Sequence, residues 1–326
     1  MLYMVYSSKA EVCPMTRFNT PLPQQQGGLF LTDGGLETTL VFHEGIDLPC
    51  FAAFDLLKDE AGAAILKDYF DIYAGMARRY GVGLILESPT WRANPDWSRR
   101  IGYADDELQD FNRKSIELMQ KLAGEYAGAG TPVVVSACIG PRYDGYRPER
   151  ILSVEEAEAY HLPQIRVYAE AGADVVSAFT MTNVEESVGI VNAAKACDIP
   201  VVISFTVETD GRIPTGQTLK EAIKAVDHET DNGPAYYMIN CAHPSHFETV
   251  LDTGEDWVHR IMAIRANASR RSHEELDESE ELDTGNPKEL AGDYRRLLDK
   301  LGHVTVLGGC CGTDHRHVDE IFRLCA

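Results

Sequence analysis

Eight short apolar runs recur along the 326-residue chain, and they limit the folds open to it more than any other feature. Each run is rich in Val, Ile, Leu and Phe. The apolar residues are continuous rather than alternating, which is typical of parallel strands covered on both faces. The runs span residues 29–35, 82–91, 131–140, 173–182, 200–207, 236–243, 258–269 and 303–312.

Helical patterns lie between these runs, clearest in residues 105–130, 153–174, 183–200 and 218–230. The second of them opens with Ser153 and Glu156, the spacing of a capping box. Strand–helix alternation repeated eight times predicts the α/β class and a (β/α)8 barrel, or TIM barrel. A doubly wound open sheet is the alternative.

No linker or break in composition divides the chain, so we expect a single barrel domain over residues 28–326. Residues 1–27 have no long apolar segment and no charged start typical of a signal peptide, so they are expected to form a flexible tail.

The composition excludes several classes of partner. The formal net charge is −21 and no basic stripe is present, so neither nucleic acid nor an anionic membrane is an expected partner. No run reaches the roughly 18 apolar residues of a membrane span. The acidic stretch 273–283 is expected to be a solvated loop or helix face. Eight irregularly spaced cysteines indicate a cytoplasmic protein with free or metal-bound thiols.

Polar and sulfur-bearing residues follow several of the predicted strands. In (β/α)8 barrels the chemistry takes place at the carboxyl ends of the strands. The residues in question are Asp33, Glu87, Asn240, Cys241, Cys310 and Cys311. The position of these residues at strand ends supports the barrel independently, because the apolar runs alone define the predicted strands.

Cys241 ends the sixth run, and the adjacent Cys310 and Cys311 end the eighth. In a closed barrel only one strand separates these two, so the three sulfurs can meet at one mouth. Three thiolates without an evident fourth ligand match a catalytic Zn²⁺ site that keeps a position open for substrate. Thiolates also disfavour Mg²⁺ and Ca²⁺. The alternatives are a disulfide between Cys310 and Cys311 or two buried thiols.

Glycines surround the cysteine pair, at Gly308, Gly309 and Gly312, and are expected to let the backbone curl around a metal. The remaining cysteines outside the tail are expected to be packing residues: Cys50, Cys138, Cys197 and Cys325. The nearby histidines could supply a further metal ligand, but each is expected instead to lie at the surface or behind the ligands: His243, His246, His315 and His317.

A metal with three thiolate ligands and an open position can bind a substrate thiol and lower its pKa. A free thiol has a pKa of about 8.5 and is mostly unreactive at pH 7. The anionic ligands leave electron density on the bound sulfur, which stays nucleophilic. Alkyl transfer to sulfur is the expected chemistry.

The chain resembles the homocysteine S-methyltransferase family over residues 28–326. The motifs that carry the resemblance are "TDGG" (32–35), "LESPTWRAN" (86–94), "SFTVETDGRIPTGQTL" (204–219), "INCAH" (239–243) and "GGCCGT" (308–313). The resemblance implies a (β/α)8 barrel with zinc held by Cys241, Cys310 and Cys311. It also implies that the bound thiol is that of homocysteine.

The same resemblance implies how the acceptor's amino and carboxylate groups are bound. Asp33 and the backbone amides of Gly34 and Gly35 match the family's binding turn. A second family acid, at the end of the fourth strand, is replaced here by Phe179. Glu37 and Glu87 are candidates to supply the missing carboxylate. Glu37 can also be read as an exposed acid at a helix start. Asn240, beside Cys241, is a further candidate for substrate binding.

The expected function is zinc-dependent methyl transfer to a thiol, homocysteine giving methionine. S-methylmethionine, S-adenosylmethionine, betaine and a folate all remain open as methyl donor. The partners are therefore small molecules, and a homo-oligomer is possible. The alternatives are alkyl transfer to a different thiol, which Phe179 favours, and a non-catalytic zinc- or redox-sensing barrel.

Overall fold

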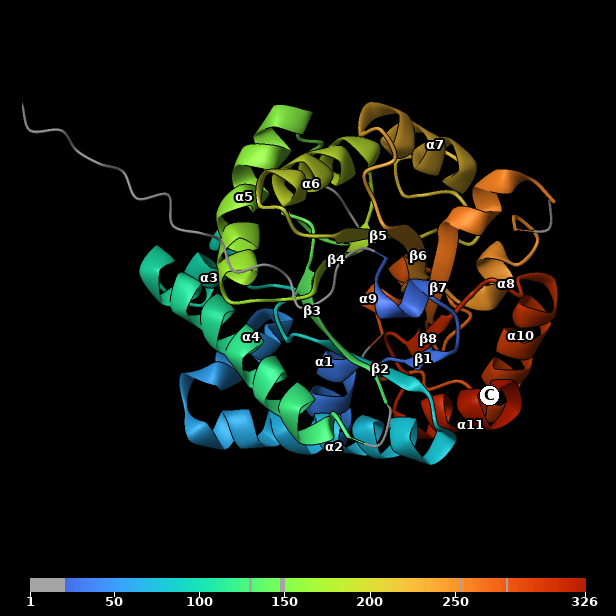
Figure 1. The fold of residues 1–326 in the computed structure, drawn as a ribbon, viewed down its shortest axis with the longest axis horizontal. Helices are drawn as coiled ribbons and strands as arrows, with labels where there is room; N and C mark the ends of the chain where they lie inside the picture. Colours follow the sequence, from blue (N-terminus) through green and yellow to red (C-terminus); the bar gives the residue numbers. More distant parts are fainter. Residues whose placement is uncertain (1–20, 129–130, 147–149, 252–253, 280) are drawn as a thin grey trace, which may run out of the picture.

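The computed structural model of the chain describes residues 21–128, 131–146, 150–251, 254–279 and 281–326. Eight parallel strands close into a barrel in the order of the sequence, and β8 pairs with β1 (Figure 1). The predicted (β/α)8 barrel is confirmed. The strands are β1 (Phe30–Leu31), β2 (Gly83–Glu87), β3 (Val133–Ile139), β4 (Val175–Met181), β5 (Val201–Phe205), β6 (Tyr236–Asn240), β7 (Ile261–Ala266) and β8 (Val306–Gly309).

Helices surround the barrel, and the four predicted helical segments are all helical in part (Figure 1). The α-helices are α1 (Leu36–Thr38), α2 (Glu60–Tyr80), α3 (Pro95–Arg100), α4 (Asp105–Tyr126), α5 (Val154–Glu170), α6 (Val184–Ala196), α7 (Leu219–Glu229), α8 (Pro244–Phe247), α9 (His273–Asp277), α10 (Pro287–Lys300) and α11 (His315–Cys325). The 3₁₀ and π turns are η1 (Pro23–Gln25), η2 (Thr39–His43), η3 (Pro49–Phe51), η4 (Ala53–Lys58) and η5 (Asp256–Arg260).

The predicted capping box at the start of α5 is present. The Glu156 amide donates to the Ser153 hydroxyl at 3.2 Å, and the Ser153 amide donates to the Glu156 carboxylate at 2.9 Å. Within the described ranges, every helix is too short or too polar to cross a membrane.

Apolar side chains form two layers because alternate residues of each strand face opposite sides of the sheet. One set packs against the helices, as Leu84 and Leu86 of β2 do. The other set includes Ile85 of β2 and Met238 of β6 and fills the barrel. Continuous apolar runs are the expected consequence of burial on both faces.

The end of the predicted N-terminal tail is part of the fold. Leu22 is fully buried and belongs to the cluster inside the barrel. Gln24 donates to the Tyr236 hydroxyl at 3.1 Å, and its carbonyl accepts from the Thr305 hydroxyl at 2.8 Å. A boundary at residue 27 is therefore too late, because these side chains close the end of the barrel opposite the cysteines. Residues 1–20 lie outside the described part of the chain.

Candidate active site

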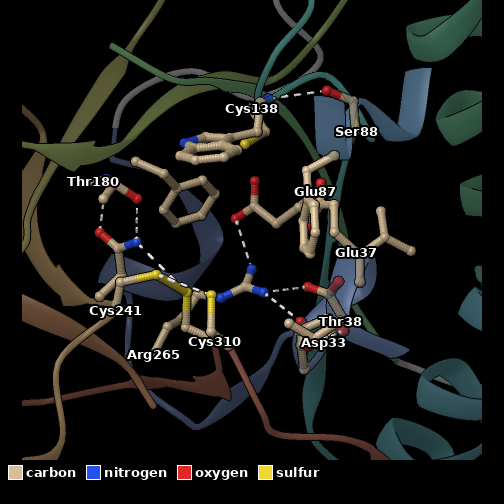
Figure 2. A pocket seen from close by; sticks show the side chains of 18 of the residues that line it. Asp33, Glu37, Thr38, Glu87, Ser88, Cys138, Thr180, Cys241, Arg265 and Cys310 are labelled. Atoms are coloured by element: carbon tan, nitrogen blue, oxygen red, sulfur yellow. Dashed lines mark hydrogen bonds and ion pairs between the residues drawn. A yellow bond between two sulfur atoms is a disulfide. The ribbon is translucent and has the colours of Figure 1, made fainter. Parts of the chain in front are cut away.

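A cavity of about 90 Å³ lies at the carboxyl ends of the strands, and its lining includes the predicted cysteines and acids (Figure 2). The alternation of side chains explains how they meet. Glu87, Phe179 and Asn240 lie two or four residues after the interior residues Ile85, Val175 and Met238 on their strands. They therefore share the inward face and point into the mouth.

The three predicted metal ligands meet at this mouth. The sulfurs of Cys241, Cys310 and Cys311 all lie within 4.8 Å of one another. Those of Cys241 and Cys311 are 3.7 Å apart. Tetrahedral Zn–S bonds of about 2.3 Å place two sulfurs about 3.8 Å apart, so the cluster fits one zinc ion.

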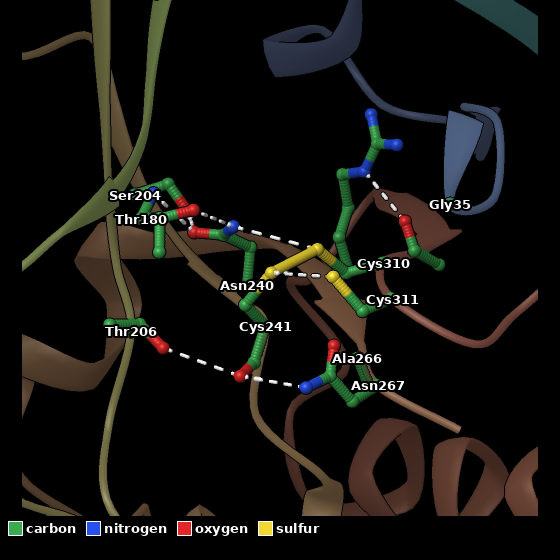
Figure 3. Close-up of a disulfide and its surroundings, with 12 residues drawn as sticks. Gly35, Thr180, Ser204, Thr206, Asn240, Cys241, Ala266, Asn267, Cys310 and Cys311 are labelled. Carbon is green, nitrogen blue, oxygen red and sulfur yellow. Dashed lines mark hydrogen bonds between the residues drawn. A yellow bond between two sulfur atoms is a disulfide. The ribbon is translucent and has the colours of Figure 1, made fainter. Parts of the chain in front are cut away.

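The structure joins Cys241 and Cys310 in a disulfide, whereas Cys311 is free (Figure 3). This differs from the expected three thiolates and also from a disulfide between the adjacent Cys310 and Cys311. The reason is geometric: the ends of β6 and β8 bring Cys241 and Cys310 together, with Cα atoms 5.3 Å apart. Reduction must precede metal binding, because a metal ligand must be a thiolate.

Local backbone geometry aims the cysteines at one point. Cys241 has a φ of 54°, which is costly for a residue with a side chain. Its carbonyl accepts from the Asn267 side chain at 3.0 Å (Figure 3). The His273 ring also contacts this carbonyl, at 2.7 Å. Of the three glycines beside the pair, Gly312 has a positive φ of 77°. A side chain at Gly309 would collide with Thr313, so this position requires glycine for space.

Asn240 supports the cluster rather than offering a free amide to a substrate. Its side-chain oxygen accepts from the Thr180 amide at 2.9 Å and the Ser204 hydroxyl at 2.5 Å. Its side-chain nitrogen donates to the Thr180 hydroxyl at 2.9 Å and lies 3.8 Å from the Cys310 sulfur (Figure 3). Asn240 thus links β4, β5 and β6 behind the sulfurs.

Tyr146 and His273 were not predicted as site residues. The Tyr146 hydroxyl lies 3.5 Å from the Cys311 sulfur, and its ring stacks on His273 with centroids 4.3 Å apart. Burial raises the pKa of Tyr146 well above its usual value, so the hydroxyl stays protonated and can donate to a thiolate. The expectation that residues 273–283 form a solvated face is wrong for His273, which is buried.

Arg265 of β7 is the largest addition to the predicted site. Its guanidinium pairs with Asp33 at 2.7 Å and lies 3.9 Å from Glu87 (Figure 2). It also donates to the Gly309 carbonyl at 2.9 Å, the Thr32 hydroxyl at 3.0 Å and the Gly34 carbonyl at 3.1 Å. Both ion-pair partners are at least nine-tenths buried.

Asp33 has little capacity left for a substrate. One carboxylate oxygen accepts from Arg265 and from the Thr32 hydroxyl at 3.2 Å. The other accepts from the Tyr69 hydroxyl at 3.0 Å. The Gly35 amide donates to the Thr313 carbonyl at 3.0 Å, which does not fit the implied role of that amide in binding substrate. Gly34 and Gly35 still line the cavity.

Glu37 and Glu87 both line the cavity, and both carboxyls have raised pKa values. Burial raises the pKa of Glu87 to about 7, against the opposing effects of Arg265 and the Ser136 hydroxyl. Burial also raises the pKa of Glu37 to about 7, with a smaller contribution from the charge of Asp33. Glu37 does lie in the first turn of α1, as one interpretation of it expected, but its side chain is half-buried at the cavity rather than fully exposed.

Phe179 lies against Arg265, with the guanidinium carbon 5.0 Å from the ring centroid. A cation–π contact of this kind favours a positive charge at the ring face. The position that the resemblance assigned to an acid is therefore next to a resident cation.

Among the other cysteines, the expectation of a packing residue is wrong for Cys50, which is exposed, whereas Cys197 and Cys325 are partly buried. Cys138 is buried and lines the cavity, away from the three-cysteine cluster. His243 lies 3.4 Å from Asp293, and the His317 ring contacts the Thr284 carbonyl at 2.8 Å. Neither belongs to the metal-ligand cluster found in the described residues.

Comparison with known proteins gives a consistent picture. A family model described as homocysteine S-methyltransferase matches residues 30–325. Selenocysteine Se-methyltransferase of Brassica oleracea var. italica is 24% identical over 90% of this chain and 87% of its own length. Homocysteine S-methyltransferase 2 of Arabidopsis thaliana is 23% identical over 89% of this chain and 91% of its own.

Solved structures with a similar fold include the homocysteine methyltransferase MmuM from Escherichia coli. Its metallated form has a TM-score of 0.69 and 18% identity, covering 91% of this chain and 96% of that one. Its oxidized form has a TM-score of 0.70, also at 18% identity, covering 90% of this chain and 94% of that one.

Proposed function

Because the chain belongs to the homocysteine S-methyltransferase family, we propose that it methylates the thiol of homocysteine, giving methionine, at a zinc ion held by Cys241, Cys310 and Cys311. The chain is a methyltransferase that acts on a thiol. The metal, the acceptor and the residues that bind it are the proposed parts.

The observation that carries the proposal is the meeting of three cysteine sulfurs within 4.8 Å at the mouth of the barrel. A zinc ion bound there would supply an open position that binds an acceptor thiol and lowers its pKa, so that the sulfur is a nucleophile at neutral pH. A relative described as a metallated homocysteine methyltransferase supports a metal in this fold.

The chain's own residues prepare the site for that chemistry. Burial raises the pKa of Cys311, so this thiol stays protonated until a metal displaces its proton. The Tyr146 hydroxyl lies 3.5 Å from the same sulfur and can donate to it once it is a thiolate, and the Asn240 amide lies 3.8 Å from the Cys310 sulfur. In the transfer, the acceptor sulfur forms a bond to the methyl carbon as the bond from that carbon to the donor breaks. The acceptor's thiol proton is released to solvent.

Membership of an enzyme family removes the alternative of a non-catalytic sensing barrel. A different acceptor stays a candidate, because Phe179 and Arg265 alter the charge of the acceptor pocket. A selenol also belongs in any test, given the relative named selenocysteine Se-methyltransferase.

The test uses reduced protein reconstituted with zinc. It is incubated with homocysteine, selenocysteine or another thiol and with each of several methyl donors, and the methylated products are measured by mass spectrometry. We expect methionine from homocysteine with at least one donor.

Matched variants assign the site. Cys310→Ala and Cys241→Ala should lose both bound zinc and methyl transfer while keeping the circular-dichroism spectrum of a folded barrel. Cys50→Ala, at an exposed cysteine, should keep both. A Cys310→Ala protein with full zinc content and undiminished transfer would rule the proposal out.

A further inference from the structure

We propose that Glu87 is the residue that binds the acceptor's ammonium group. The inference rests on the proposed function and names the part of the cavity that selects an amino-acid thiol. Glu87 is the last residue of β2, across the mouth from the cysteines that follow β6 and β8 (Figure 2).

The first step is the state of the Glu87 carboxylate. Only 7% of Glu87 is exposed, and its Oε2 atom has no hydrogen-bond partner. A buried acceptor left without a partner costs free energy, and such atoms are uncommon in native proteins. Since Glu87 lines the cavity, a ligand with donor hydrogens would satisfy this atom.

The second step excludes Asp33 as the main receptor. Both of its oxygens already accept from the protein, and the nearest cation, Arg265, neutralises its charge at 2.7 Å. An ammonium placed beside Asp33 would also approach the Arg265 guanidinium and be repelled by it. Glu87 faces the same guanidinium at a longer distance, 3.9 Å from its Oε1 atom, and its Oε2 atom is left free.

The third step excludes the guanidinium itself as a site for the acceptor's carboxylate. Arg265 donates to Thr32, Gly34 and Gly309 as well as to Asp33, so four of its five N–H donors are occupied, and its Nη1 atom also faces Glu87 at 3.9 Å. Arg265 is therefore held in place by contacts within the protein. The Phe179 ring also lies against its guanidinium, with the guanidinium carbon 5.0 Å from the ring centroid. The free acceptor atom in this part of the cavity belongs to Glu87.

Charge agrees with this assignment. Arg265 lies closer to Asp33, at 2.7 Å, than to Glu87, at 3.9 Å, so the charge of Glu87 is the less compensated of the two. An ammonium beside Glu87 would complete a pair of opposite charges at a carboxylate that is only 7% exposed, where such pairing matters most.

The test measures equilibrium binding by calorimetry, with reduced, zinc-loaded protein. Its ligands are homocysteine and 4-mercaptobutanoate, which differs from homocysteine only by lacking the amino group. In the wild type we expect homocysteine to bind at least about tenfold more tightly. In Glu87→Gln the Kd for homocysteine should rise until the two ligands bind within about threefold of each other, and the Kd for 4-mercaptobutanoate should barely change.

Glu37→Gln is the matched control, since it removes a carboxylate of similar pKa from the same cavity. It should keep the preference for homocysteine. Zinc content and the melting temperature of each variant are measured alongside, so that loss of metal or of folding is recognised.

The outcomes separate this inference from the proposed function. If Glu87→Gln keeps the wild-type preference, or if only Glu37→Gln loses it, the assignment to Glu87 is wrong. If wild type binds both thiols equally, no ammonium receptor exists, but thiol binding at the metal stands. If neither thiol binds, the proposed function fails and the inference fails with it.

Discussion

Arg265 connects three segments of the barrel mouth through side-chain contacts. It reaches from β7 to the turn after β1, to Glu87 of β2 and to the Gly309 carbonyl of β8. A buried ion pair is costly to break, because removal of one partner leaves the other as an uncompensated charge. The pair of Arg265 and Asp33 also occupies the Asp33 carboxylate, whereas one oxygen of Glu87 stays available to a ligand.

Replacing Arg265 by leucine should therefore destabilise the protein by about 3–5 kcal/mol. The measurement is the free energy of unfolding from denaturant titration. The double variant Arg265→Leu/Asp33→Asn should be more stable than Arg265→Leu alone. It also removes the Asp33 charge that would otherwise be buried without its partner. Arg113→Leu breaks an ion pair on the surface of α4 and should cost less than about 1 kcal/mol. Equal losses in the two single variants would contradict the role of the pair.

Glu87 makes stability depend on pH. Its pKa is raised from 4.5 to about 7, so the native state binds more protons than the unfolded state between these values. Stability contributed by this group is therefore greatest at low pH and falls as pH rises from about 4.5 to about 7. The charge of Asp33 opposes the ionisation of Glu87, whereas Arg265 and the Ser136 hydroxyl favour it, and burial and the charge of Glu87 together raise the pKa of Cys138.

Glu87→Gln should thus be more stable than wild type at pH 8, by up to about 3 kcal/mol, and the difference should vanish near pH 4. Thermal unfolding of the zinc-free, reduced proteins at the two pH values measures it. A constant difference across the range would mean that Glu87 ionises normally in the folded protein.

Among the secondary-structure elements, the short turn η1 was the least foreseeable. Three residues carry no periodicity, and Leu22 and Gln24 lie in a polar, proline-containing segment. Their burial follows from the barrel, whose open end needs an apolar side chain and hydrogen-bond partners for Tyr236 and Thr305.

Leu22→Ala should destabilise the protein by about 2–5 kcal/mol, the cost of a cavity in a packed interior. Denaturant unfolding compares it with Leu324→Ala at the exposed end of α11, which should change stability by less than about 0.5 kcal/mol. A loss in Leu22→Ala as small as in this control would show that the barrel does not need η1.

Strands and cysteines were predictable for one physical reason. Burial on both faces makes each strand a continuous apolar run. Each run ends at the mouth of the barrel, where polar and sulfur-bearing side chains can contact a ligand. Cys241, Cys310 and Cys311 stand at such ends and could be placed together from topology alone. Arg265 stands at an equivalent end, but a single arginine inside the run "IMAIRANAS" was read as part of the strand. Arg265 lies two residues after Ala263, which faces the barrel interior. The side chain of Arg265 could therefore have been predicted to face the mouth of the barrel.

Other parts of the site depend on packing that no local pattern encodes. Tyr146 lies in a loop after β3 and reaches Cys311 across 165 positions of sequence. The two carboxylate oxygens of Asp33 are occupied by Tyr69 of α2 and Arg265 of β7. Neither residue is near Asp33 in sequence. The disulfide between Cys241 and Cys310 likewise depends on the distance between two strand ends.

Taken as a whole molecule, the barrel is closed at one end by Leu22, directly before η1, and carries its three-cysteine cluster at the other. The cluster of side chains between them is apolar, and Cys241 and Cys310 directly follow the strands β6 and β8 that enclose it. Precise positioning of this kind is what a catalytic metal site requires.

The coordination of zinc before and after homocysteine binds tests the central claim most directly. X-ray absorption at the zinc edge, on reduced and zinc-loaded protein, counts the sulfur ligands and gives their distances. The account predicts three sulfurs at about 2.3 Å with one lighter atom, changing to four sulfurs when homocysteine is added. A shell of fewer than three sulfurs, or a shell that homocysteine leaves unchanged, would contradict it.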